Sequence, residues 1–195
     1  MAKKNTKTEC SGIEWGQFLL LIDRLKRSKD YRFLLLISIG GYCGMRVGDM
    51  LRLKWDDVIN RDEIILQEGK TGKHRTITLN QSLKDIVCYC ETVHFDGGEI
   101  KLSDFIFCNR NDTPFSRQYV NRQLHRIFKE CKIKVQNGSS HTLRKTFGRR
   151  VYEMNEHSEA SLVLLSSIFN HTSIAITRKY IGLTQEKIQD VYINL

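Results

Sequence analysis

The sequence has little proline, no low-complexity tract and no long apolar run. Its 195 residues include a single proline, Pro114, and no low-complexity tract, so long disordered linkers are not expected. The longest apolar run, Phe33 to Ile39, is too short to span a bilayer. The N-terminus, Met1-Ala2-Lys3-Lys4, leads into polar residues and lacks the apolar stretch of a secretory signal. These absences predict a soluble, cytoplasmic protein without a membrane partner.

Cysteine is present, but in no pattern that indicates a metal site. None of the six cysteines forms a C-x-x-C pair or has a histidine partner at ligand spacing, so no metal is expected. Apolar runs around four of them predict buried free thiols in a reducing compartment. The six are Cys10, Cys43, Cys88, Cys90, Cys108 and Cys131. The sequence also lacks a P-loop and a carboxylate cluster, and we expect no cofactor.

Positive charge is what the sequence has in excess. Lysine and arginine number 31 against 22 acidic residues, which gives a formal net charge of +9. Such an excess is expected of a nucleic-acid-binding protein. It would also fit binding to anionic lipid, or a basic protein with no polyanionic partner. With 41% apolar residues the chain can form a sizeable core, and its length favours one domain.

Periodic apolar residues predict a mainly helical domain. A capping-box pattern at Ser11–Glu14 predicts the start of a helix with Phe18, Leu19, Ile22 and Leu25 on its apolar face. A second helix is expected after residue 30, ending at the glycines 40 and 41 or shortly beyond them. Further helices are expected over residues 46–54, 81–94, 117–132, from about 141, over 159–169, around residue 180, and over 185–192.

A small sheet is expected beside these helices. The β-rich runs Glu63–Leu66 and Thr76–Leu79 flank the polar segment 68–73, which predicts a β-hairpin. Phe105–Cys108 is expected to form a third strand or a short extended piece. The predicted fold class is α+β and mainly α, a helical domain with a small antiparallel β-sheet. We expect residues 1–10 to be disordered or a linker, 11–183 to form the domain, and 184–195 to form a helical tail.

Four short segments carry residues that suit chemistry on a phosphodiester. Residues 41–51 contain an arginine within the run Cys-Gly-Met-Arg-Val-Gly-Asp, and residues 69–73 present lysines on the predicted hairpin. Residues 141–144 form an H-x-x-R box, and residues 170–180 begin with Asn-His and end in tyrosine. Alone each segment is a weak signal, because surface arginines, turn lysines and packed tyrosines are common.

Together and in this order, the four segments resemble the tyrosine recombinases, or phage integrases, over roughly residues 11 to 185. The resemblance implies a catalytic domain that cuts and rejoins DNA through a 3′-phosphotyrosyl link, in integration, excision or inversion of mobile-element or phage DNA. It implies double-stranded DNA as partner, a monomer without DNA, a homotetramer on two duplexes, accessory DNA-bending proteins, and association with the nucleoid. The catalytic residues that it implies are Arg46, Lys70, His141, Arg144, His171 and Tyr180.

These residue types fit the chemistry on physical grounds. A phosphodiester under attack gathers charge on its non-bridging oxygens, which the guanidiniums of Arg46 and Arg144 can clamp. The phenol of Tyr180 can form an ester that a DNA hydroxyl attacks in turn, which conserves the bond for rejoining. Lys70 could give a proton to the departing 5′ oxygen, and the two histidines could assist at the phosphate or at the phenol.

Several other polar residues are expected to support the site. Asp49 could orient a guanidinium as a neighbouring anion, without being catalytic. Contacts to DNA phosphates are expected from some of the remaining basic residues. The candidates are Arg110, Arg117, Arg122, Arg149, Arg150 and Lys179.

Two other functional classes stay open on the sequence. A type IB topoisomerase-like enzyme would share these residues and relax supercoils without a specific site, whereas a DNA-binding regulator would form no covalent adduct. The sequence also departs from the family pattern, since Phe169-Asn170-His171 stands where Leu-Gly-His is common. The stretch before His171 is long, and no core-binding domain fits before residue 11, which predicts a fragment or a short single-domain recombinase that inverts promoter segments.

Overall fold

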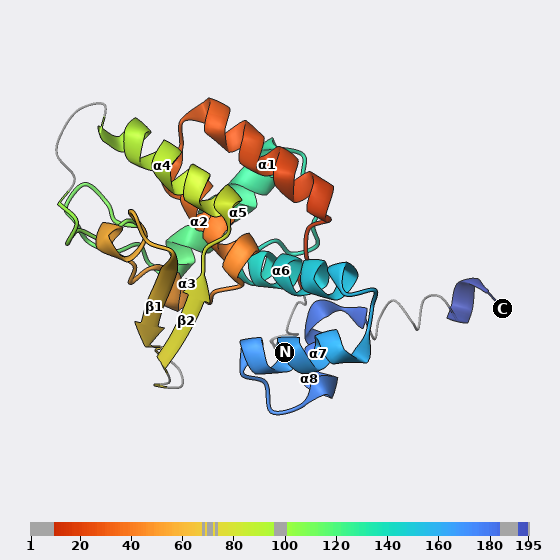
Figure 1. The fold of residues 1–195 in the computed structure, drawn as a ribbon. Coiled ribbons are helices and arrows are strands. Elements are labelled where there is room, and N and C mark those ends of the chain that lie inside the picture. The colour runs from red at the N-terminus through yellow and green to blue at the C-terminus, as the bar shows by residue number, and fades with distance from the viewer. Residues whose placement is uncertain are drawn as a thin grey trace, which may run out of the picture.

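The chain folds around one central helix, with other helices packed about it and a β-hairpin at one edge (Figure 1). The computed structural model describes residues 10–67, 69, 72, 74–95, 101–183 and 191–194. The elements are α1 (Trp15–Ser28), α2 (Tyr31–Cys43), α3 (Val47–Met50), η1 (Trp55–Asp57), β1 (Glu63–Gln67), β2 (His74–Thr78), α4 (Gln81–Phe95), α5 (Arg117–Glu130), α6 (Ser140–Met154), α7 (Glu159–Phe169) and α8 (Ile174–Ile181). This mainly helical arrangement with a small antiparallel sheet confirms the predicted fold class.

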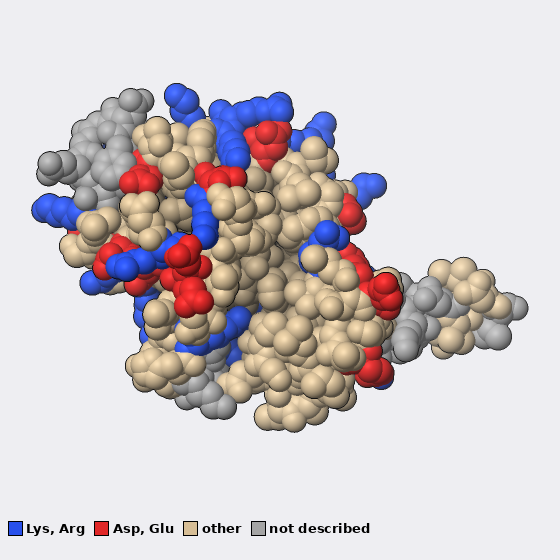
Figure 2. All heavy atoms as spheres, viewed as in Figure 1, with Lys and Arg blue, Asp and Glu red and all other residues tan. Residues whose placement is uncertain are grey.

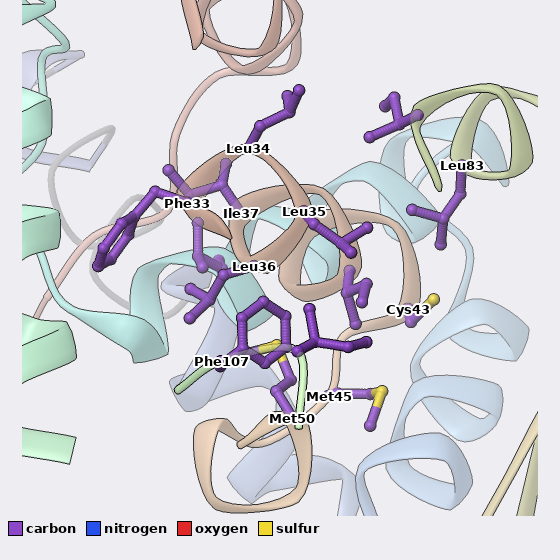
Figure 3. Close-up of a cluster of buried hydrophobic side chains, with 14 of the residues drawn as sticks. Phe33, Leu34, Leu35, Leu36, Ile37, Cys43, Met45, Met50, Leu83 and Phe107 are labelled. Atoms are coloured by element: carbon purple, nitrogen blue, oxygen red, sulfur yellow. The ribbon is translucent and has the colours of Figure 1, made fainter. Parts of the chain in front are cut away.

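The central helix is α2, which is apolar on every side. A helix of this kind is stable only when it is buried all round, and its side chains from Phe33 to Ile37 are all buried. Figure 3 shows them fanning outward from the helix toward Met50, Leu83 and Phe107 on other elements. The buried apolar side chains around α2, contributed by α1 to α6 and the hairpin, form what we call the main core.

A second, smaller core lies between α6, α7 and α8. It consists of Leu162, Leu165, Phe169 and Ile181, and we call it the C-terminal core. Helix α6 belongs to both cores, because Leu143 is buried in the main core while Phe147 packs against the C-terminal core. We call α7 and α8 together the C-terminal unit, which lies below α6 in Figure 1.

The hairpin pairs β1 with β2 in an antiparallel register that sets Glu63 opposite Thr78 and Gln67 opposite His74. Its side chains alternate as a two-sided strand requires: Ile64 is fully buried, whereas Ile65 is 68% exposed. The hairpin therefore packs one face on the main core.

Two predictions about the first helix were wrong. The first helix begins at Trp15 with Glu14 as its N-cap, because the Glu14 carboxylate accepts hydrogen bonds from two backbone amides of the first turn. Ser11 instead pairs with Gln136, its hydroxyl accepting from the Gln136 amide at 2.9 Å. On the same helix Phe18, Ile22 and Leu25 are buried as predicted, whereas Leu19 is 43% exposed and Leu21 is buried instead.

Other boundaries also differ from expectation. The helix predicted over 46–54 spans only Val47–Met50. Of the two alternatives for Phe105–Cys108, the structure has the short extended piece, which forms isolated bridges at its ends. All six cysteines are free, but Cys88 is exposed, since it faces outward from α4. The helix expected over residues 185–192 and the segment expected to be disordered at 1–10 fall almost entirely outside the described residues.

The apolar helices show no simple membrane span. Within the described ranges, no single helix is long and apolar enough to cross a bilayer; α7 and α8 meet the criterion only as a pair, by length and composition, with a bend of 93° between them.

Candidate active site

One cavity of about 700 Å³ collects side chains from five parts of the chain. Its walls come from the residues around α3, the hairpin turn at Gly69, the N-terminal half of α5, the start of α6, and the C-terminal unit. Five of the six residues predicted to be catalytic line it, namely Arg46, His141, Arg144, His171 and Tyr180. Residues that are far apart in the sequence thus meet around one space.

The two arginines are brought together by a turn and by a helix. Gly44 ends α2 in the left-handed conformation, with φ of 60°, and a side chain there would collide with the ring of Phe147 at 2.5 Å. The chain then runs extended through Arg46, which caps α3. Arg144 projects from α6 and is only 3% exposed. The glycine is therefore required both for the turn and for the close approach of α6.

A single carbonyl oxygen joins the two guanidiniums. The Phe169 carbonyl at the end of α7 accepts from Arg46 Nη2 at 3.0 Å and from Arg144 Nη2 at 3.1 Å. Arg144 also donates to the Gly44 carbonyl, and its guanidinium lies 4.2 Å from the centroid of the Phe169 ring. Because these bonds fix both groups beside each other, the cavity holds two forked, permanent positive charges suited to an oxyanion.

Tyr180 faces this pair from α8. Its hydroxyl lies 3.5 Å from His141 Nδ1, and its ring packs edge-on against Phe169 and His171, with centroid distances of 5.4 Å and 5.3 Å. Ile181, next along the helix, is 1% exposed and fixes α8 on the C-terminal core. The phenol is thus held by packing on one side and meets a histidine nitrogen on the other.

His171 is oriented by a buried threonine. Its Nδ1 lies 3.0 Å from Thr177 Oγ1, and Thr177 is fully buried on α8. The backbone of the α7–α8 turn adds a hydrogen bond from the His171 amide to the Ser166 carbonyl at 2.9 Å. The contact between Nδ1 and the threonine hydroxyl thus orients the His171 ring where it lines the cavity.

The electrostatic environment acts differently on the phenol and on the imidazole beside it. Burial raises the pKa of Tyr180 to about 12, against the lowering effect of the nearby Arg144 and Arg46. Partial burial lowers the pKa of His141, and the positive charges of Arg144 and Lys145 lower it further. At neutral pH these shifts favour a protonated phenol beside a neutral imidazole, which can accept a proton.

Asp49 and Arg52 connect the hairpin to the cavity wall through hydrogen bonds. Asp49, which is 7% exposed, accepts a hydrogen bond from the Gly69 amide at 3.1 Å and from Arg52 Nη2 at 2.9 Å. Arg52 Nη2 also donates to the Gln67 carbonyl at 2.7 Å. The carboxylate that was expected to orient a guanidinium therefore binds Arg52 and the turn of the hairpin. Lys70, the sixth predicted residue, lies outside the described residues.

Besides Arg52, sequence reasoning missed one residue that lines this cavity and one that lies beside Tyr180. Asn121 on α5 lines it and accepts a hydrogen bond from the Ser140 amide at 3.0 Å, which fixes the start of α6. Lys145 follows Arg144 and is buried against Tyr180. No periodic signal marks either residue, because lysine and asparagine on a helix are ordinarily solvated.

Basic side chains are unevenly distributed over the surface. Figure 2 shows lysine and arginine over the upper helices, along the edge with the long loops, and near the hairpin, whereas the part formed by α7 and α8 is mostly uncharged on this face. Arg117, one of the candidates for phosphate contact, lines the cavity itself, and its guanidinium lies against Gly48.

The whole arrangement has counterparts among known proteins. A sequence model described as the phage integrase family matches residues 14–187. The chain belongs to the phage integrase family. The integrase/recombinase YoeC of Bacillus subtilis is 31% identical over 168 residues, covering 86% of this chain and 84% of YoeC. The tyrosine recombinase XerH of Campylobacter jejuni is 24% identical over 191 residues, covering 97% of this chain but 49% of XerH.

Solved structures of other family members share the fold. A crystal structure of the XerA recombinase superposes with a TM-score of 0.71 at 20% identity, covering 100% of this chain and 66% of XerA. XerH bound to a palindromic difH substrate, in a post-cleavage complex, gives 0.70 at 21% identity, covering 98% of this chain and 55% of that one. This integrase-family chain thus spans little more than half the length of several relatives that it matches.

Proposed function

We propose that this chain is the catalytic domain of a site-specific tyrosine recombinase, with residues 11–183 as the domain and Tyr180 as the nucleophile. One observation carries the proposal. A tyrosine, two histidines and two arginines that are spread from residue 46 to residue 180 line one cavity. Membership of the phage integrase family supports DNA recombination as the activity.

The proposed reaction is a pair of transesterifications. The Tyr180 hydroxyl attacks a DNA phosphorus, a bond forms between phosphorus and the phenolic oxygen, and the bond to the 5′ oxygen breaks. His141, whose nitrogen lies 3.5 Å from the phenolic oxygen, accepts the phenol proton. Lys70 gives a proton to the 5′ oxygen. The reverse sequence, with a 5′ hydroxyl of another strand as the attacker, releases Tyr180 and rejoins the DNA.

The arginines stabilise the charge that builds up during attack. Arg46 and Arg144 are held side by side by the Phe169 carbonyl, so little reorganisation is needed when a phosphate arrives. His171, oriented by Thr177, donates to another phosphate oxygen. Removing one such donor is expected to slow a reaction by about 100- to 1000-fold.

The proposed partner is double-stranded DNA, bound by four protomers on two duplexes, with a monomer in its absence and accessory bending proteins where the site requires them. Solved relatives support the DNA partner, since XerH is bound to difH and a lambda integrase dimer is bound to a COC′ core site. The proposed role is integration, excision or inversion of a mobile element or phage, with the tail after Gly182 docking on a neighbouring protomer.

Covalent trapping tests this proposal. The protein is incubated with a pool of nicked duplexes that carry candidate attachment sequences from the DNA around its gene, and the products are run on a denaturing gel. We expect a DNA-linked protein band that Tyr180→Phe removes, while the variant still binds DNA. A band that persists in Tyr180→Phe contradicts the assignment. Relaxation of supercoiled plasmids without such a sequence would instead favour a type IB topoisomerase.

A further inference from the structure

A buried lysine stands directly beside the proposed nucleophile, and the proposed reaction does not use it. Lys145 follows Arg144 on α6 and is only 8% exposed. Lysine is almost never buried without a partner, because removing an ammonium from water is costly. Burying an apolar side chain at this position would cost less free energy, so the charge of Lys145 needs an explanation.

The ammonium is held in place by the chain segment that precedes α1. Lys145 Nζ donates to the Cys10 carbonyl at 2.7 Å. The next residue of α6, Thr146, accepts a hydrogen bond from the Ile13 amide at 2.8 Å. Gly12 lies between these two bonds, where an added Cβ would come within 3.2 Å of the Thr146 amide nitrogen. The segment from Cys10 to Ile13 is therefore pressed against α6 and fixes the direction of the lysine.

The other neighbour of this ammonium is the nucleophile. Lys145 Nζ lies 5.4 Å from the centroid of the Tyr180 ring, within the distance of about 6 Å over which a cation is attracted to an aromatic face. A phenolate ring carries far more negative charge than a phenol ring, so the attraction grows when Tyr180 loses its proton. The Lys145 ammonium also favours the position of the Tyr180 ring in which this contact is made.

Several other groups act on the same phenol. Those that face it from neighbouring elements are Arg46, His141, Arg144, His171 and the thiol of Cys10, and its own helix carries Arg178 and Lys179. Arg46 and Arg144 are committed to the Phe169 carbonyl, on the side where the phosphate would bind. Once a phosphate binds there, its negative charge offsets these arginines, whereas Lys145 does not line the cavity and keeps its effect on the ring.

We propose that Lys145 is a positioning residue for Tyr180: its ammonium, anchored on the Cys10 carbonyl, holds the ring and favours the phenolate that attacks the DNA. This inference rests on the proposed function for its consequence in catalysis. Its electrostatic part concerns the free protein and can be measured without DNA.

The direct test is a titration of Tyr180 in the intact protein. Tyrosine is replaced throughout by 3-fluorotyrosine, whose phenol is more acidic, and the ionisation of residue 180 is followed by ¹⁹F NMR, with its signal identified by its loss in Tyr180→Phe. Lys145→Met removes the charge, Lys145→Gln keeps a donor for the Cys10 carbonyl, and Lys145→Arg keeps both. Lys26→Met is the matched control, because Lys26 Nζ lies 5.9 Å from the ring of Tyr89.

We expect Lys145→Met and Lys145→Gln to raise the pKa at residue 180 by about one unit, which is about a tenfold loss of phenolate at a given pH. Lys145→Arg should keep it near the starting value, and Lys26→Met should leave it unchanged. An unchanged pKa in a folded Lys145→Gln protein overturns the proposal, as does a shift in Lys145→Arg as large as that in Lys145→Gln.

The same variants are then compared in covalent adduct formation over a range of pH. If the starting protein forms the adduct, Lys145→Gln should form it about tenfold more slowly at neutral pH and recover as the pH rises. A loss that is equal at every pH would mean a structural role only and would overturn the catalytic part of the inference. Absence of any adduct with the starting protein would contradict the proposed function instead, and the titration would still decide the role of Lys145.

Discussion

The main core and the C-terminal core are expected to differ in how rigidly they hold the side chains of the candidate site. Arg46 follows the buried helix α2, and Arg144 is buried on α6, so the backbone that carries these two charges belongs to elements of the main core, although both guanidiniums bond the Phe169 carbonyl of the C-terminal unit. Tyr180 and His171 depend on the C-terminal unit, whose core is formed by Leu162, Leu165, Phe169 and Ile181. Elements with little buried apolar surface open more readily than the rest of a protein. The backbone that carries the two arginines is therefore expected to be rigid, and the helix that carries the nucleophile Tyr180 is expected to be comparatively mobile.

The largest expected effect comes from the residue that joins the two parts. Arg144→Ala removes a phosphate donor and also the bonds to Gly44 and Phe169, so adduct formation should fall by at least about 1000-fold. Arg46→Ala, which removes one hydrogen bond to the Phe169 carbonyl, should slow adduct formation by about 100- to 1000-fold. Rates of adduct formation in single-turnover gels measure both. Arg126→Ala, on the exposed face of α5, is the control. Equal rates for Arg144→Ala and the control would contradict the assignment.

Truncating one side chain in each core tests the comparison itself. Phe169→Ala should cost about 3–5 kcal/mol, and we expect it to release hydrogen-exchange protection in α7 and α8 while α2 stays protected. Leu35→Ala, in the main core, should lower protection everywhere, because unfolding of α2 is global. Hydrogen exchange read by mass spectrometry measures both. If Phe169→Ala exposes α2 as much as α8, the two cores are one cooperative unit.

A smaller effect is expected at the hairpin. Arg52→Ala removes the bonds to Asp49 and to the Gln67 carbonyl and should loosen the turn that bears Lys70, which slows adduct formation by about tenfold if Lys70 is the acid. A substrate with sulfur in place of the 5′ oxygen has a leaving group that needs no proton, so it should restore the rate. Failure of this substrate to restore it would place the role of Arg52 elsewhere. Arg61→Ala, at another exposed ion pair, is the control.

The smallest expected effect is on stability at mildly acidic pH. The pKa of His141 is lowered in the folded protein, so above the unfolded value of about 6.5 both states are neutral and nothing is lost. As the pH falls below that value, the unfolded chain takes up a proton that the folded one resists, and stability decreases. Urea denaturation at pH values from 8 to 5 measures the free energy of unfolding. Its decrease should be smaller for His141→Gln than for the starting protein, and His125→Gln on α5 should behave like the starting protein. An identical decrease in His141→Gln would contradict this.

Sequence reasoning reached the fold and most of the candidate site because the relevant signals are local. The helix over 159–169 and the hairpin follow from apolar periodicity and glycine-bearing turns, and the order of the four motifs indicated one family. It failed at Ser11, where the sequence matches a capping box but Glu14 caps the helix and the Ser11 hydroxyl accepts from the Gln136 amide. No short-range pattern encodes such a partner.

The supporting contacts of the site were the least predictable. Asp49 was expected to orient a guanidinium, and it does bind that of Arg52, three residues further on; its second partner, the Gly69 amide, approaches only after the hairpin has packed. The sequence did not indicate a role for Lys145, because its burial depends on Cys10 and Tyr180 meeting across the fold. Motifs therefore indicated the reacting groups, whereas the residues that position them required the structure.

The most direct test of the account is to identify the amino acid that becomes attached to DNA. The covalent adduct would be digested with nuclease and trypsin, and the nucleotide-bearing peptide would be sequenced by mass spectrometry. The account predicts a nucleotide joined through its 3′ phosphate to Tyr180, at the start of the peptide that follows Lys179. A nucleotide on any other residue, or a link through a 5′ phosphate, would contradict it.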